Sequence, residues 1–160
     1  MEINNKYNVL EAIELIKSHT LLLEREEWLR KKKETFSGTD AAILMGISKY
    51  STPYRLYLNK EEDIETKINF SMERGKYLEP LIVKYFKKRY NYHIINLSDE
   101  NNEKEGIIIH PFHKIISGTP DRLAVDNDGF LMVLEIKSVV GYGVDNWSAG
   151  IPEEYKIQLQ

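Results

Sequence analysis

One stretch of the chain decides most of what can be said about its fold. Residues 118–137 read GTPDRLAVDNDGFLMVLEIK. Two runs rich in apolar and β-branched residues flank the polar segment 126–129, so the stretch predicts a β-hairpin. A three-residue loop over 127–129, with Gly129 in the left-handed conformation, would pair Asp126 with Phe130.

The register of this hairpin decides where its charged side chains lie. With the three-residue loop, the pairing continues until Asp121 lies opposite Glu135, and Lys137 shares the face of Glu135 because strand side chains alternate. A two-residue loop would instead place Asp121 on the opposite face. In the first case, two carboxylates and an ammonium group converge on one small surface.

Such a cluster suits metal-assisted hydrolysis of phosphodiesters. Two adjacent carboxylates bind a hard cation such as Mg²⁺, which polarises a phosphoryl oxygen and activates a bound water. A nearby lysine can hold or deprotonate that water. A Glu-x-Lys pair on a strand is more often a solvated face, but residues 131–136 are apolar apart from Glu135. This run indicates burial on both faces, where an unpaired charge is costly.

The rest of the chain predicts helices first and strands later. Helix starts are expected at Ser37 and Thr52, and a longer helix over 70–90 should begin or kink at Pro80. Strand candidates follow at 93–97, 107–110, 115–125 and 130–140, and the tail from Ser148 turns helical again. We expect one α/β domain over residues 1–160, helical to about residue 90, with the sheet and the site over about 91–160.

Composition limits the class of protein. The chain has 160 residues, 42% hydrophobic and 29% charged, as in ordinary folded domains. It has no cysteine, so disulfides, thiolate metal sites and a cysteine nucleophile are excluded. No apolar run approaches the roughly 20 residues of a transmembrane helix, and no signal-peptide pattern is present, so we expect a cytoplasmic protein without a membrane partner.

The net charge of −3 does not argue against DNA as a partner. Basic residues cluster at 30–33 and 84–89, while some of the acidic residues are candidate metal ligands. The sum therefore mixes two populations of charge with different roles.

The order of the motifs resembles that of the YqaJ-like, lambda-type phage exonucleases of the PD-(D/E)xK nuclease superfamily. The matching motifs are WL at 28–29 with the following basic residues, SGTDAA at 37–42, MGISKY at 45–50, RGKYLEP at 74–80, TPD at 119–121, EIK at 135–137 and YKIQLQ at 155–160. The resemblance implies a restriction-endonuclease-like core, in which helices flank a mixed β-sheet after a helical N-terminal region. Relative to that family, we expect a domain truncated at its C-terminal end.

The resemblance also implies a metal centre. Asp121, Glu135 and the main-chain carbonyl of Ile136 would bind Mg²⁺, for which Mn²⁺ would substitute. Lys137 would orient the attacking water.

Further roles follow from the same resemblance. Glu79 would lie behind the metal ligands or hold a second metal or water, and Gln158 would position Lys137 or the water. From the residues alone, both also suit exposed helix positions. The resemblance implies that Lys32, Thr39 and Thr119 bind the 5′-phosphate of DNA.

Two positions depart from the family's pattern. Lys32 stands where arginine is typical and lacks the bidentate fork of a guanidinium group. Arg122 stands where glycine is usual after Pro-Asp, which would alter the approach of DNA. His110 and His113 are interpreted as structural residues rather than metal ligands.

The function implied is that of a Mg²⁺-dependent 5′→3′ exonuclease acting on double-stranded DNA ends in phage recombination. Its expected partners are a single-strand annealing protein and two further copies of the chain in a homotrimer. Two alternatives stay open: an endonuclease of the same superfamily, and a non-catalytic DNA-binding or assembly module that kept the fold.

Overall fold

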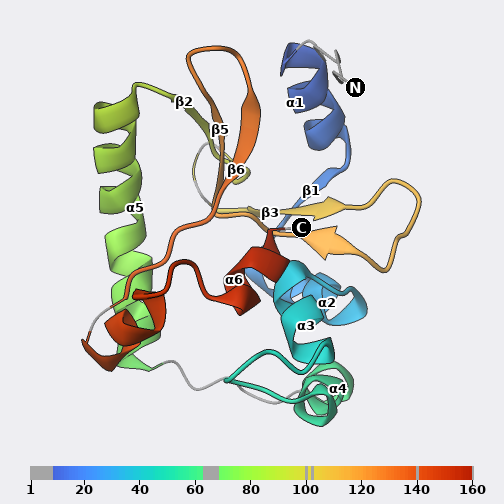
Figure 1. Cartoon of the computed structure of the whole chain (residues 1–160). Helices are drawn as coiled ribbons and strands as arrows, with labels where there is room; N and C mark the ends of the chain where they lie inside the picture. Colours follow the sequence, from blue (N-terminus) through green and yellow to red (C-terminus); the bar gives the residue numbers. More distant parts are fainter. Residues whose placement is uncertain (1–8, 63–68, 100, 102, 140, 160) are drawn as a thin grey trace, which may run out of the picture.

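The computed structural model describes residues 9–62, 69–99, 101, 103–139 and 141–159, and shows a mixed α/β protein (Figure 1). Helices dominate the first half of the described chain, and short strands dominate the second. The helices are α1 (Val9–Ser18), α2 (Arg25–Glu34), α3 (Gly38–Leu44), α4 (Pro53–Glu61), α5 (Phe70–Tyr90), the 3₁₀ helix η1 (Gly141–Trp147) and α6 (Glu153–Gln158).

The strands form two three-stranded antiparallel sheets within the described residues. One sheet has the order β1-β3-β4 and the other β2-β5-β6. Their strands are β1 (Thr20–Leu23), β2 (His93–Ile95), β3 (Glu105–Ile109), β4 (Ser117–Gly118), β5 (Arg122–Val125) and β6 (Leu131–Leu134).

The predicted hairpin is confirmed, with the three-residue loop. Asp126 donates its N–H to the carbonyl of Phe130 at 3.1 Å, and Gly129 has φ 85°. The carboxylate of Asp126 stabilises the turn by accepting from the N–H of Asp128 at 2.9 Å and of Phe130 at 2.8 Å. In β5 and β6, Arg122 pairs with Leu134. The next pair in this register is Asp121 and Glu135.

The expected single mixed sheet is replaced by two antiparallel ones. The connections at 110–116, between β3 and β4, and at 126–130, between β5 and β6, are too short for the crossovers that parallel neighbours need. Parallel pairing is limited, in the described chain, to one isolated bridge between Phe36 and Ile116. The predicted strand at 115–125 breaks into β4 and β5 because Pro120, lying between them, has no N–H for a ladder hydrogen bond.

Three further predictions, on the N-terminal region, Pro80 and the strand after the turn, differ from the structure. The region before residue 90 is not all helical, because β1 pairs with β3. Helix α5 runs through Pro80 without a break; Pro80 is exposed, so water can reach the carbonyl that loses its helical partner. Strand β6 is not buried on both faces, since Val133 is 51% exposed.

The core is small and lies where the strands meet the helices. Its buried apolar residues are Ala42, Ile43, Leu56, Leu97, Ile107, Ile109, Leu123 and Ala124. Thr35 and Ser117 are also buried, and their hydroxyl groups are hydrogen-bonded at 2.7 Å. None of the described helices is long and apolar enough to cross a membrane.

The closing helix α6 packs against the start of α3. Ser37 caps α3, and its N–H donates to the carboxylate of Asp40 at 2.9 Å. A Cβ atom on Gly38, the first residue of α3, would lie only 2.3 Å from the main-chain oxygen of Gln158. The absence of a side chain at Gly38 therefore allows α6 to reach this position.

We expect Gly38→Ala to displace α6 and lower stability by about 1–3 kcal/mol, the usual cost of overpacking. Urea unfolding gives the free energy, and the fluorescence of Trp147 reports α6 because its ring stacks on Tyr155 at 5.3 Å. Gly75→Ala is the matched control, since a Cβ on that helical glycine meets nothing within 4 Å. Equal stability of the two variants would contradict close packing at Gly38.

Candidate active site

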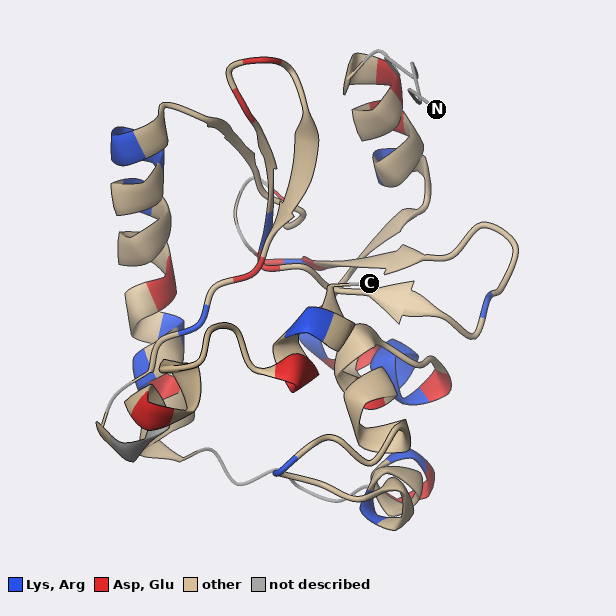
Figure 2. Ribbon diagram, viewed as in Figure 1, with Lys and Arg blue, Asp and Glu red and all other residues tan. Residues whose placement is uncertain are grey.

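Charged residues gather in the middle of the molecule, where β5 and β6 lead out of their sheet (Figure 2). Asp121 lies just before β5, while Glu135 and Lys137 lie just after β6. The two sheets separate at this point, because Thr119–Asp121 links β4 of one sheet to β5 of the other. The site thus occupies the junction between the two sheets.

In each of the two carboxylates, Asp121 and Glu135, one oxygen accepts hydrogen bonds from the protein. Asp121 Oδ2 accepts from the main-chain N–H of Ile136 at 2.6 Å. Glu135 Oε1 accepts from Gln158 Nε2 at 2.7 Å and from the ammonium group of Lys137. The Glu135 side chain is 10% exposed, so these two donors offset the cost of burying its charge.

Three oxygens at the site accept no hydrogen bond from the described residues. They are Asp121 Oδ1, Glu135 Oε2 and the carbonyl oxygen of Ile136. The described residues contain no cluster of three or more histidine and acidic side chains arranged for a metal. Two carboxylates with water are a normal set for Mg²⁺, which keeps several of its waters in proteins.

Lys137 is fixed from two sides. Its ammonium group pairs with Glu135, and it lies 5.1 Å from the ring centroid of Tyr155. Desolvation by burial is the main cause that raises the pKa of Tyr155 to about 12, and a hydrogen bond with Tyr50 adds to it, so this ring is neutral. Tyr155 had no predicted role, although it opens the closing YKIQLQ motif.

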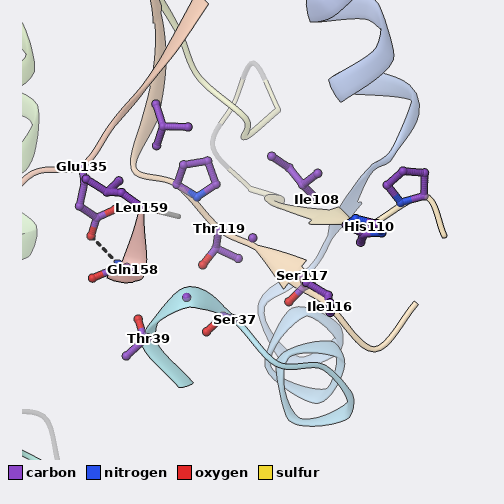
Figure 3. A pocket seen from close by; sticks show the side chains of 15 residues that line it. Ser37, Thr39, Ile108, His110, Ile116, Ser117, Thr119, Glu135, Gln158 and Leu159 are labelled. Atoms are coloured by element: carbon purple, nitrogen blue, oxygen red, sulfur yellow. Dashed lines mark hydrogen bonds between the residues drawn. The ribbon is translucent and has the colours of Figure 1, made fainter. Parts of the chain in front are cut away.

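Gln158 reaches the site from α6 (Figure 3). Its Nε2 donates to Glu135 Oε1, the atom that also accepts from Lys137. Its expected role in positioning Lys137 or the water stays a prediction. The last residue of the motif, Gln160, lies outside the described residues.

Glu79 approaches from α5 but pairs with a different group. Its Oε1 lies 2.8 Å from Nη1 of Arg122, and Arg122 also donates to the main-chain carbonyl of Asp121. The structure does not gather Glu79 with Asp121 and Glu135 into a three-acid cluster. Arg122 is the residue that departs from the family's pattern after Pro-Asp, and its partner Glu79 was not predicted.

A pocket of about 340 Å³ opens beside Glu135 and Gln158 (Figure 3). Two of the three residues expected to bind a 5′-phosphate, Thr39 and Thr119, line it. Ser37 and Ser117 add hydroxyl groups to the same wall. The pocket thus joins the predicted phosphate contacts to the carboxylate site.

Lys32, the third predicted phosphate contact, is not one of the residues lining this pocket. Its Nζ lies 4.4 Å from the ring centroid of Trp28. Burial lowers the pKa of Lys32, while the charge of Asp40 opposes that shift. The structure therefore brings together two of the three expected residues.

Lys60 also had no predicted role. It connects α4 to residues 32–40, which join α2 to α3. Its ammonium group pairs with Asp40 at 3.2 Å and donates to the carbonyls of Thr35 at 2.6 Å and Lys32 at 3.1 Å. Lysine at the end of a short helix carries no signal for this role, because its partners are 20 to 28 residues away.

Comparison with known proteins places this hairpin and its helices in one family. The YqaJ-like viral recombinase domain matches residues 27–160. A Bacillus subtilis (strain 168) protein described as uncharacterized protein YqaJ is 30% identical over 141 residues, which cover 86% of this chain and 41% of the relative. The chain thus spans about two fifths of that relative's length. Since the match includes the hairpin, α3, α5 and α6, the chain belongs to the YqaJ-like viral recombinase domain family.

Proposed function

We propose that this chain is a Mg²⁺-dependent 5′→3′ exonuclease that hydrolyses linear double-stranded DNA during phage-type recombination. One observation carries the proposal: Asp121 and Glu135 follow the last pair of the β5–β6 ladder, Arg122 and Leu134, and one oxygen of each accepts a hydrogen bond at the site, where Lys137 pairs with Glu135. Membership of a viral recombinase family supports it. A restriction-endonuclease-like core, a homotrimer and a single-strand annealing partner belong to the same proposal.

The two carboxylates and the Ile136 carbonyl would hold the metal ion, which when bound supplies Lewis acidity and an activated water. Lys137 holds that water and stabilises the charge that develops on the phosphoryl oxygens. The face of Tyr155 keeps the ammonium group in place. Gln158 fixes the orientation of the Glu135 carboxylate by donating to Oε1.

The pocket beside the carboxylates would receive the DNA end. Thr39 and Thr119 supply hydroxyl donors to the terminal phosphate. Lys32 does not line this pocket, and its ammonium group would have to turn from the Trp28 ring to reach the phosphate. The basic last turns of α2 and α5 would contact the backbone without reading sequence.

We expect the chain to degrade a linear duplex with Mg²⁺ and to stop when the metal is chelated. Gln158→Ala should lower the rate about 10–100-fold, as loss of a residue orienting a ligand usually does. Glu135→Gln and Lys137→Ala should lower it further. Glu153→Gln is the control, because this acid of α6 is 62% exposed and pairs with Lys156 on the same helix. Release of nucleotides from an end-labelled duplex measures the rates.

Substrate form separates the alternatives. A circular duplex that stays intact supports the exonuclease, and nicking of that circle would assign an endonuclease instead. Binding of linear DNA with no cleavage by any variant would point to the non-catalytic module.

We expect Lys32→Ala to reduce the preference for 5′-phosphorylated ends, because the phosphate loses a nearby positive charge. Lys31→Ala is the matched control, since Lys31 pairs with Glu34 on the same helix. The measurement is the ratio of rates on phosphorylated and unphosphorylated duplexes. A parent protein with equal rates on both substrates would reject this assignment.

A further inference from the structure

The ion pair between Glu79 and Arg122 lies beside the site but is not used by the chemistry above. Arg122 opens β5 directly after Asp121, so its side chain projects to the other face of the strand. Its Nη1 lies 2.8 Å from Glu79 Oε1 on α5, and the two side chains are 20% and 29% exposed. The same nitrogen donates to the main-chain carbonyl of Asp121.

This arrangement balances the charge of Glu79 with a permanent cation. A guanidinium group stays protonated at any accessible pH. Recruiting Glu79 to a metal ion would leave Arg122 half-buried without its acid, which is destabilising. A second divalent cation beside Glu79 would also have to approach the positive charge of Arg122.

A second contact braces the same helix against the hairpin. Arg74, five residues before Glu79, donates from Nη2 to the carbonyl of Ser138 at 3.1 Å. Ser138 directly follows Lys137, so Arg74 ties α5 to the segment after β6, and Glu79 ties α5 to β5 through Arg122. These two ties hold Glu79 at the start of β5 and oppose a shift of α5 that would carry it elsewhere.

We propose that Arg122 limits the site to a single divalent cation by keeping Glu79 as its ion-pair partner. Arg122 is a positioning residue, since it acts through Glu79 and through the backbone of Asp121. The inference rests on the proposed function, because it presupposes a metal at Asp121 and Glu135. Without the guanidinium group, Glu79 becomes a free carboxylate near the site and gains affinity for a second cation.

The test counts Mn²⁺ on the metal-free full chain, using electron paramagnetic resonance of free Mn²⁺ and titration calorimetry. We expect the parent and Glu79→Gln to bind one equivalent with nearly the same affinity. Arg122→Gln should gain a second equivalent, and the double variant should return to one. Arg122→Lys, which keeps the charge, should stay at one. Arg89→Gln is a control for loss of an arginine elsewhere on the chain.

The outcomes separate this inference from the proposed function. If Asp121→Asn leaves Mn²⁺ binding unchanged, or if the parent binds none, both the proposed function and this inference are wrong. If Asp121→Asn abolishes binding but Glu79→Gln removes one of two equivalents from the parent, only the inference fails. That second comparison needs no variant at Arg122, so it holds even if Arg122→Gln does not fold.

Discussion

The site depends first on the turn of one hairpin. Gly129 adopts φ 85° and Asp126 accepts two main-chain hydrogen bonds, which together set a three-residue loop. That loop determines the register of β5 and β6, and the register brings Asp121 opposite Glu135. Because strand side chains alternate, a shift by one residue would send one carboxylate to the other face. The relative placement of the two carboxylates therefore depends on a turn five or six residues away, or roughly 17–20 Å along the strands at about 3.3 Å a residue.

Packing between distant helices completes the site. Gly38 allows α6 to approach α3, and α6 then carries Gln158 to Glu135 and Tyr155 to Lys137. A side chain at position 38 would separate these helices, so a residue with no chemistry of its own controls two groups that contact the site. This is why the packing of α6 and the chemistry of the hairpin cannot be treated separately.

The partly buried acids differ in how their charge is balanced. Asp40 pairs with Lys60, Glu79 with Arg122 and Glu135 with Lys137. Asp121 has no basic side chain as a partner among the described residues; it accepts a main-chain N–H.

The amino-acid sequence alone determined features set by neighbours in the chain: the hairpin, and the starts of α3 and α4 at Ser37 and Thr52. It left two loop lengths open for the hairpin, and the structure shows the three-residue loop that sets the register. Turn chemistry, capping and the two-residue period act over a few positions, so they can be read from local residues. Only the tertiary structure decided the division into two sheets, the pairing of Glu79 with Arg122, and the contact of Lys32 with Trp28 rather than with the pocket. The sheet division and the ion pair join residues far apart in sequence, while the direction of Lys32 depends on which neighbours pack around it. Local patterns therefore cannot specify them.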